Sequence, residues 1–267
     1  MKRSLLTLTL TFSTLSGLAA AQGAASPPLP TKLAYLVSSS ASPDGKYTLA
    51  AYEEKIQHGQ GEDRWESDVG FYIGRMNGDK LEIVSDRVFD REGTEPDNDN
   101  GPAVLTWSRD RGPDDARVSK YVVVNDQWRK HNDLRFLRLV NGKYVKQVYT
   151  EEKYAKEEQA VLQAAVKQLG LGKEYRLAHS TSNTDLAFEP PTKPNEDFEV
   201  IGDEVLKSGL DFSKPFYVVH TATYDTNNED ENADYYTFNV LSVVKIEKDE
   251  QGNLKDTKVL IKAEGLK

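Results

Sequence analysis

The sequence predicts a mainly β protein built from antiparallel sheets. Short runs rich in β-branched and aromatic residues alternate with turn residues along most of the chain, which is typical of consecutive strands joined by hairpins. One hairpin-like segment occurs twice with nearly the same pattern, and only one segment has helical periodicity. These observations favour two to three repeated antiparallel units with a single helix.

The first 21 residues have the pattern of a secretory signal peptide. Lys2 and Arg3 form a basic start, residues 5–18 are uncharged and mostly apolar or small, and three alanines at 19–21 supply a cleavage signature. The apolar stretch is shorter than the roughly 20 residues that a membrane-spanning helix needs. No later segment is apolar enough to span a bilayer. We therefore expect cleavage before Gln22 and export to the periplasm or the extracellular space.

The charge and the absence of cysteine limit the partners and the sources of stability. Removal of Lys2 and Arg3 takes the formal net charge from −9 to −11. Such a chain repels nucleic acid and anionic lipid, so cations, neutral ligands or basic partners fit better. Because the chain has no cysteine, packed sheets or bound ions must supply the stability that disulfides give many exported proteins.

Strand signals begin after a leader at residues 22–32, which is rich in small residues and proline and is expected to be flexible. Residues 33–267 are expected to form a single β-rich domain. A polar, proline-rich stretch at 189–198 predicts a loop. The clearest strand runs are Lys46–Tyr52, Val69–Arg75, Lys80–Val84, Ala103–Trp107, Lys120–Asn125, Leu134–Val140, Lys143–Tyr149, Pro215–Tyr224, Tyr235–Ile246 and Thr257–Lys262.

One amphipathic helix is predicted near residues 151–169. The segment is rich in Ala, Glu, Lys, Gln and Leu, and its apolar residues recur at helical spacing. Thr150 is a suitable N-cap, and Gly170 follows the last turn as a C-terminal glycine does. We expect this helix to pack on a sheet.

The repeated hairpin is the strongest internal pattern. Trp65 and Trp128 are 63 residues apart, and the pairs Asn77–Gly78 and Asn141–Gly142 are 64 residues apart. Asn-Gly between two β runs is a strong hairpin signal because both residues tolerate positive φ angles. A weaker third copy runs from 234 to 253.

The segment Ser42–Tyr47 (SPDGKY) resembles the turn of the PD40-type blades of TolB-like β-propellers. In such a blade this turn joins the first strand to the second, so the resemblance implies blade-like units at about 33–86, 103–149 and 175–263. The spacing near 64 residues exceeds the usual roughly 40–45, and closed rings normally need at least four blades. The sequence therefore leaves open an incomplete propeller, a propeller closed by oligomerisation, and a β-sandwich-like fold with duplicated hairpins.

Two acidic, asparagine-rich segments, at 86–102 and 225–234, are candidate calcium loops. If the units are blades, both segments lie on one face. Calcium prefers carboxylate, amide and carbonyl oxygens, and oxygen-bearing residues alternate in both segments. The alternative is that these segments are solvated loops. The candidate ligands are Asp97, Asp99, Asn100, Asp225, Asn227, Glu229 and Asp230.

The two repeated tryptophans are candidate ligand-binding residues. Aromatic rings at loop tips can stack on sugars or peptides, and His58 and His131 flank Trp65 and Trp128. The alternative is that each ring caps the core of its own unit. A zinc site would need further ligands that the sequence does not indicate.

These features favour a non-enzymatic function. The sequence has no nucleophile-elbow, zinc-protease, phosphate-loop or dinucleotide-binding motif. We therefore expect an exported binding or accessory protein of the cell envelope that presents acidic loops to a protein or glycan, with calcium as a candidate ion. The alternatives are a secreted hydrolase acting on polysaccharide or peptide, and a structural envelope protein that assembles through strand edges.

Overall fold

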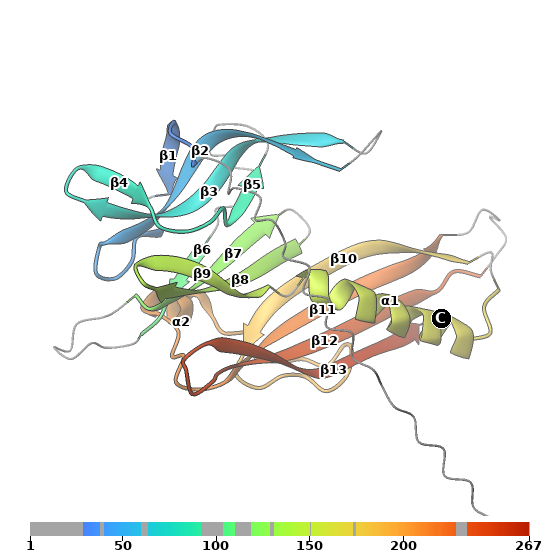
Figure 1. Cartoon of the computed structure of the whole chain (residues 1–267). Helices are drawn as coiled ribbons and strands as arrows, with labels where there is room; N and C mark the ends of the chain where they lie inside the picture. The colour runs from blue at the N-terminus through green and yellow to red at the C-terminus, as the bar shows by residue number, and fades with distance from the viewer. Residues whose placement is uncertain are drawn as a thin grey trace, which may run out of the picture.

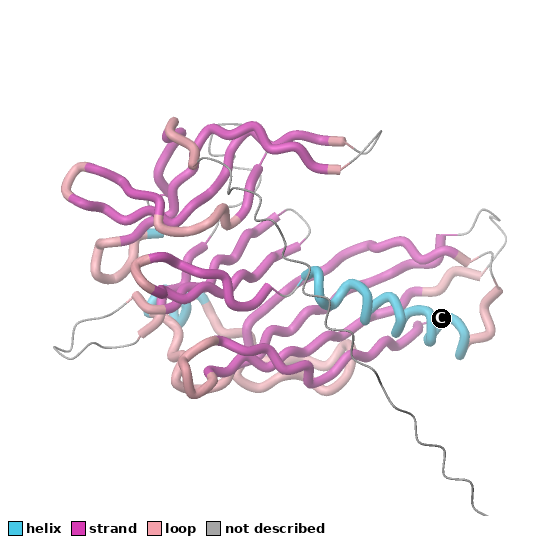
Figure 2. Tube along the Cα trace, in the orientation of Figure 1, coloured by secondary structure: helices cyan, strands magenta, loops and turns pink. Residues whose placement is uncertain are grey.

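The computed structural model describes residues 29–37, 40–59, 64–91, 104–109, 119–128, 131–149, 151–172, 175–227 and 234–266. These residues form three antiparallel sheets and two helices, with no closed barrel (Figure 1). Figure 2 shows that strands dominate the trace. The predicted mainly β class is confirmed.

Strands that are adjacent in sequence are also adjacent in each sheet. The first sheet adds a short fifth strand, β5, which pairs with β3 beyond the end of β4. Its strands are β1 (Leu33–Val37), β2 (Tyr47–His58), β3 (Trp65–Asn77), β4 (Lys80–Ile83) and β5 (Phe89–Arg91). Those of the second sheet are β6 (Val104–Trp107), β7 (Tyr121–Trp128), β8 (His131–Val140) and β9 (Lys143–Tyr149). The third sheet contains β10 (Arg176–Ala187), β11 (Phe216–Asn227), β12 (Thr237–Lys248) and β13 (Leu254–Leu266).

The three sheets stack, with the second sheet in the middle (Figure 1). On β7, Val122 and Val124 belong to the core shared with the first sheet, whereas Tyr121 and Val123 belong to the core shared with the third. Successive residues of a strand point to opposite faces, so an unbroken apolar run suits a strand buried on both sides. The KYVVVN run thus fits a middle layer.

The predicted helix is present as α1 (Glu151–Gln168), which Gly170 follows with a φ of +71°. Leu162 of α1 packs on Phe238 and Val240 of β12. Farther along β12, the same face packs against the second sheet. The helix α1 and the second sheet therefore cover adjacent parts of one face of the third sheet. A second helix, α2 (Asp203–Ser208), was not predicted. Within the described parts of the chain, neither helix is long and apolar enough to cross a membrane.

The SPDGKY segment forms a tight turn between β1 and β2. Gly45 has a φ of +69°, and its amide donates to the Ser42 carbonyl at 2.8 Å. The Ser42 hydroxyl donates to Asp44 at 2.6 Å and accepts the Tyr47 amide at 2.9 Å. The Ser, Asp and Gly of the motif therefore each stabilise this turn.

The two Asn-Gly pairs occupy different registers, contrary to the predicted equivalence. Asn141 and Gly142 are both central turn residues, with φ angles of 50° and 80°, as in a type I′ turn. In the first sheet Asn77 pairs with Lys80, and only Gly78 of the turn has positive φ, as in a type II′ turn. The one-residue shift follows from the extra Asp79.

The strand ends of the three central hairpins point to one side of the molecule. The ends of β2–β3, β7–β8 and β11–β12 are the right-hand ends of their sheets in Figure 1, whereas the turns β3–β4, β8–β9 and β12–β13 are at the left-hand ends. We call the side toward which the ends of β2–β3, β7–β8 and β11–β12 point the hairpin side. β2 continues to His58 and β3 begins at Trp65, so both strands extend toward this side.

Candidate functional site

The repeated tryptophans lie at the hairpin side, each opposite a histidine. Trp65 of β3 pairs with His58 of β2, and Trp128 of β7 pairs with His131 of β8. Trp65 begins the third strand of the first sheet, whereas Trp128 ends the second strand of the second sheet. The two tryptophans are therefore not equivalent in position. The side chains of Trp65, Trp128 and His131 lie outside the described residues, and ligand binding by them stays a prediction.

Most of the candidate calcium ligands lie outside the described residues, namely Asp97, Asp99, Asn100, Glu229, Asp230 and the side chain of Asn227. Asp225 is described, and its carboxylate accepts a hydrogen bond from the Thr237 hydroxyl at 2.9 Å. A hydrogen bond to Asp225 also raises the pKa of Tyr235. The described part of the chain contains no group of three or more acidic or histidine side chains suited to a metal ion.

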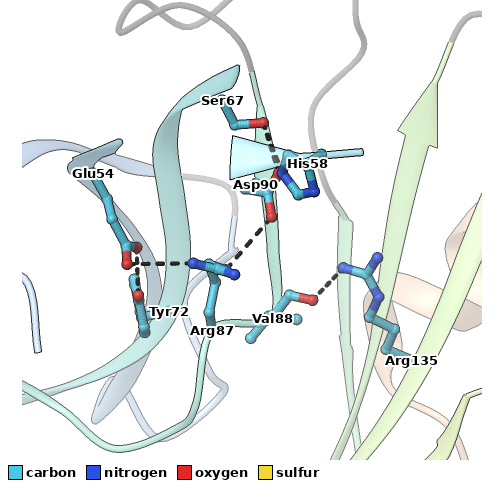
Figure 3. Close-up of polar contacts among 8 residues, drawn as sticks. All are labelled: Glu54, His58, Ser67, Tyr72, Arg87, Val88, Asp90 and Arg135. Atoms are coloured by element: carbon cyan, nitrogen blue, oxygen red, sulfur yellow. Dashed lines mark hydrogen bonds and ion pairs between the residues drawn. The ribbon is translucent and has the colours of Figure 1, made fainter. Parts of the chain in front are cut away.

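His58 belongs to a polar network that the sequence did not predict (Figure 3). Its Nε2 lies 2.8 Å from Oδ1 of Asp90, on β5. The hydroxyl of Ser67 donates to the same oxygen at 2.7 Å and lies 3.4 Å from His58 Nε2. A serine, a histidine and an aspartate from three strands therefore share one carboxylate oxygen.

This arrangement is not that of a hydrolytic triad. In such a triad the aspartate binds one ring nitrogen and the serine binds the other, so that histidine takes the serine proton. Here Ser67 and the aspartate approach the same ring nitrogen, and the serine donates its proton to Asp90. Ser67 is also fully buried, so no substrate reaches its hydroxyl. The three residues therefore form a structural contact.

The network continues through Arg87 to the outer face of the first sheet. Arg87 Nε lies 3.5 Å from the second oxygen of Asp90, and its Nη1 lies 3.3 Å from Glu54 Oε1. The Tyr72 hydroxyl donates to the other Glu54 oxygen at 2.6 Å. Burial first, and then the Glu54 contact, raise the pKa of Tyr72, so this phenol stays protonated.

Two local features of β2 and β3 make room for this network. The pairing of β2 with β3 is irregular between Glu53 and Ile56, and a bulge of this kind redirects side chains. Next to it, Gly70 of β3 pairs with Tyr52. A Cβ at position 70 would collide with the carboxylate of Glu54 and press on Arg87. A glycine inside a strand often marks such a close approach, and this was the available sequence signal.

The segment that carries this network also links the first sheet to the second. Arg135 of β8 donates to the carbonyl of Val88, as Figure 3 shows, so the second sheet contacts the segment that carries Asp90. The His58 and Asp90 side chains are 28% and 14% exposed. The two side chains are hydrogen-bonded to each other.

No protein-family model, curated protein or solved structure matches this chain.

Proposed function

We propose that this chain is an exported, non-enzymatic binding or accessory protein of the cell envelope. The observation that carries the proposal is the common direction of the hairpin ends of the three sheets (Figure 1). Stacked sheets whose hairpin strands end on one side can present a platform of loops, which suits a protein or glycan partner. The His–Trp pairs at two of these hairpins lie on the same platform.

The hydrogen-bond arrangement of the Ser67–His58–Asp90 network supports a function without catalysis. The hydroxyl is buried and already donates to a carboxylate, so the network lacks an accessible nucleophile. Polysaccharide or peptide hydrolysis by the purified protein would contradict this part of the proposal.

We further infer that the three sheets are blade-like units of an open stack. Each has four strands in chain order, to which the first sheet adds β5, and the SPDGKY turn joins β1 to β2, which is the place such a turn has in TolB-like blades. The face-to-face contact of successive sheets supports the same view.

Calcium binding through the two acidic segments is the ionic part of the proposal. β5 is antiparallel to β3, so its last residue, Arg91, lies near the hairpin side, and the segment 92–102 follows it. β11 ends on the same side, before the segment 228–233. The strands that precede both acidic segments thus run toward the hairpin side, which supports the proposal that the two segments act on one ion or one basic partner.

Calorimetry on residues 22–267 tests the calcium part. We expect heat on calcium addition, and a stabilisation of about 2.7 kcal/mol at about 100 times the dissociation constant. The variant Asp97→Asn/Asp99→Asn/Asp225→Asn/Glu229→Gln should lose both. Asp79→Asn/Glu250→Gln, which removes charge from the opposite side, should retain them. Absence of heat and of any thermal shift with the unmodified protein would remove calcium from the proposal.

Co-sedimentation with cell-envelope fractions tests the binding platform. The variant Trp65→Ala/Trp128→Ala should reduce the bound fraction, because it removes the large aromatic surfaces of two hairpins. Met76→Ala, at the opposite end of β3, is the matched control and should bind normally. Equal binding by all three proteins would show that the hairpin side is not the contact surface.

A further inference from the structure

A separate groove lies in the segment that covers the outer face of the third sheet. After β10 the chain crosses this face, where Phe198 packs on Ala187, Val219 and Leu241. It then returns beside the end of β10, since Val200 bridges to Ala187 and the Ile201 amide donates to the Leu186 carbonyl at 2.7 Å. β10 ends on the side opposite the hairpin side, so this surface is distinct from the platform described above.

The outgoing and returning arms of this segment enclose a cavity of about 430 Å³. This volume lies within the range of small-ligand pockets. Phe188 and Val200 line it and are 51% and 44% exposed, which is high for large apolar side chains. The groove thus offers apolar surface to solvent, and any ligand that covers this surface gains free energy.

The rim of the groove is acidic. Its lining contains four carboxylates, from Glu189, Glu196, Asp197 and Glu199, and no basic side chain. Glu196 is used inside the loop, where it accepts hydrogen bonds from the Thr192 amide, the Thr192 hydroxyl and the Lys193 amide. The other three carboxylates form no ion pair with any residue in the described ranges. They are therefore available to a cation.

The loop is held in shape before any ligand arrives. The contacts of Glu196 with Thr192 and Lys193 close its tip and lower the pKa of Glu196, so the carboxylate stays ionised. Lys262 of β13 donates to the Thr192 carbonyl at 2.9 Å, which fastens the tip to the sheet. Pro190 and Pro191 fix the outgoing arm. Because the groove is already formed, ordering of the loop costs little free energy when a ligand binds.

We propose that this groove binds a basic peptide segment of a partner protein, in which a lysine or arginine neighbours an apolar residue. The apolar side chain would cover Phe188 and Val200, and the cation would lie against Asp197 and Glu199. The acidic charge of the whole chain would steer such a segment toward the groove and repel anionic ligands. This binding site is independent of the hairpin side and does not require calcium.

Fluorescence anisotropy with three labelled decapeptides tests the proposal at about 0.15 M salt, where exposed charges are largely screened. The probes alternate lysine with leucine, lysine with serine, and glutamate with leucine. We expect the Lys-Leu peptide to bind and the other two to bind at least about tenfold more weakly, because each lacks one of the two contacts. No binding of the Lys-Leu peptide, or equal binding of the Lys-Ser peptide, would overturn the proposal.

Two variants locate the contact. Asp197→Asn/Glu199→Gln and Phe188→Ser/Val200→Ser should each weaken Lys-Leu binding by about tenfold. Asp79→Asn/Glu250→Gln removes the same charge elsewhere and should bind normally, as should Trp65→Ala/Trp128→Ala. Circular dichroism checks that each variant is folded, and Glu196 is left intact because it closes the loop. Equal losses in the groove variants and in the remote charge variant would show non-specific attraction and reject the site.

Discussion

The two interfaces of the middle sheet differ in how they hold their neighbours. Against the first sheet, a buried ion pair joins Arg91 of β5 to Asp126 of β7 at 2.7 Å, and the two side chains are only 9% and 6% exposed. Against the third sheet, the contact is an apolar core that contains two pairs of packed rings. The ring centroids of Phe136 and Phe216 are 5.8 Å apart, and those of Tyr121 and Phe212 are 5.0 Å apart.

The third-sheet interface also has backbone continuity. Leu210, in the segment that follows α2, exchanges hydrogen bonds with β6 and its extension, at 3.0 Å to the Trp107 carbonyl and 2.9 Å from the Arg109 amide. Gly209 allows this approach: its φ is +97°, and a Cβ there would lie 2.8 Å from the Trp107 carbonyl oxygen. The first-sheet interface has ring packing and backbone pairing too, since the ring centroids of Tyr47 and Tyr144 are 5.1 Å apart and the Tyr144 amide donates to the Val84 carbonyl at 2.6 Å. The buried ion pair is therefore what distinguishes it from the third-sheet interface.

The largest expected effect comes from emptying the aromatic interface. Phe136→Ala should lower the free energy of unfolding by about 4 kcal/mol, because the ring is fully buried and its removal leaves a cavity. Urea denaturation measures the loss. Leu139→Ala, a partly buried change on the same strand, should cost less. A loss for Phe136→Ala no larger than that control would show that the rings do not hold this interface.

The ionic interface should be nearly as sensitive to the loss of one partner. Arg91→Met leaves the buried carboxylate of Asp126 without its counter-charge and should cost about 3 kcal/mol. The double variant Arg91→Met/Asp126→Leu should regain most of that loss, because an apolar pair of similar volume needs no desolvation of charge. A double variant as unstable as Arg91→Met would mean that shape rather than charge governs this contact.

The smallest expected effect is a change in the pH dependence of stability. It concerns α1, which covers the part of the third sheet beyond the second-sheet interface. Burial raises the pKa of Glu158, while a hydrogen bond from Tyr224 opposes the shift. His220 Nε2 lies 3.8 Å from the same carboxyl group. The folded protein therefore holds this proton more tightly than the unfolded chain, whose glutamates titrate near about pH 4.3. This contribution to stability is present at low pH and is lost as pH rises through the folded pKa.

Glu158→Gln should remove that contribution, so its urea midpoint should vary less than that of the unmodified protein between about pH 4 and about pH 7. His220→Asn is the companion control, since the imidazole is the titratable group that lies next to this carboxyl. Parallel pH profiles for Glu158→Gln and the unmodified protein would contradict the assignment.

Sequence patterns predicted the regular elements well and the irregular ones poorly. Every predicted strand run overlaps a strand, and α1 lies where helical periodicity placed it. β1 and β5 were missed because they are short, and β10 because its middle, HSTSNTD, is polar. β10 forms by pairing along its length with β11, so a neighbour supplies what its own composition does not.

The candidate site was predicted in only one of its members. His58 was singled out because it lies near Trp65, but Ser67, Arg87 and Asp90 were not. Asp90 is 32 residues from His58, and no local pattern joins them. The groove beside β10 was expected only as a proline-rich loop, since its cavity depends on how the loop folds over the third sheet.

By itself the sequence determined the mainly β class, the helix α1 and the turn between β1 and β2. Those features depend on residue periodicity and on backbone angles that neighbouring side chains set. The tertiary structure alone decided that both faces of β7 are buried, that Asp90 reaches His58, and that carboxylates surround an apolar groove. Such contacts depend on strand register and sheet stacking, which only the packing of distant segments fixes.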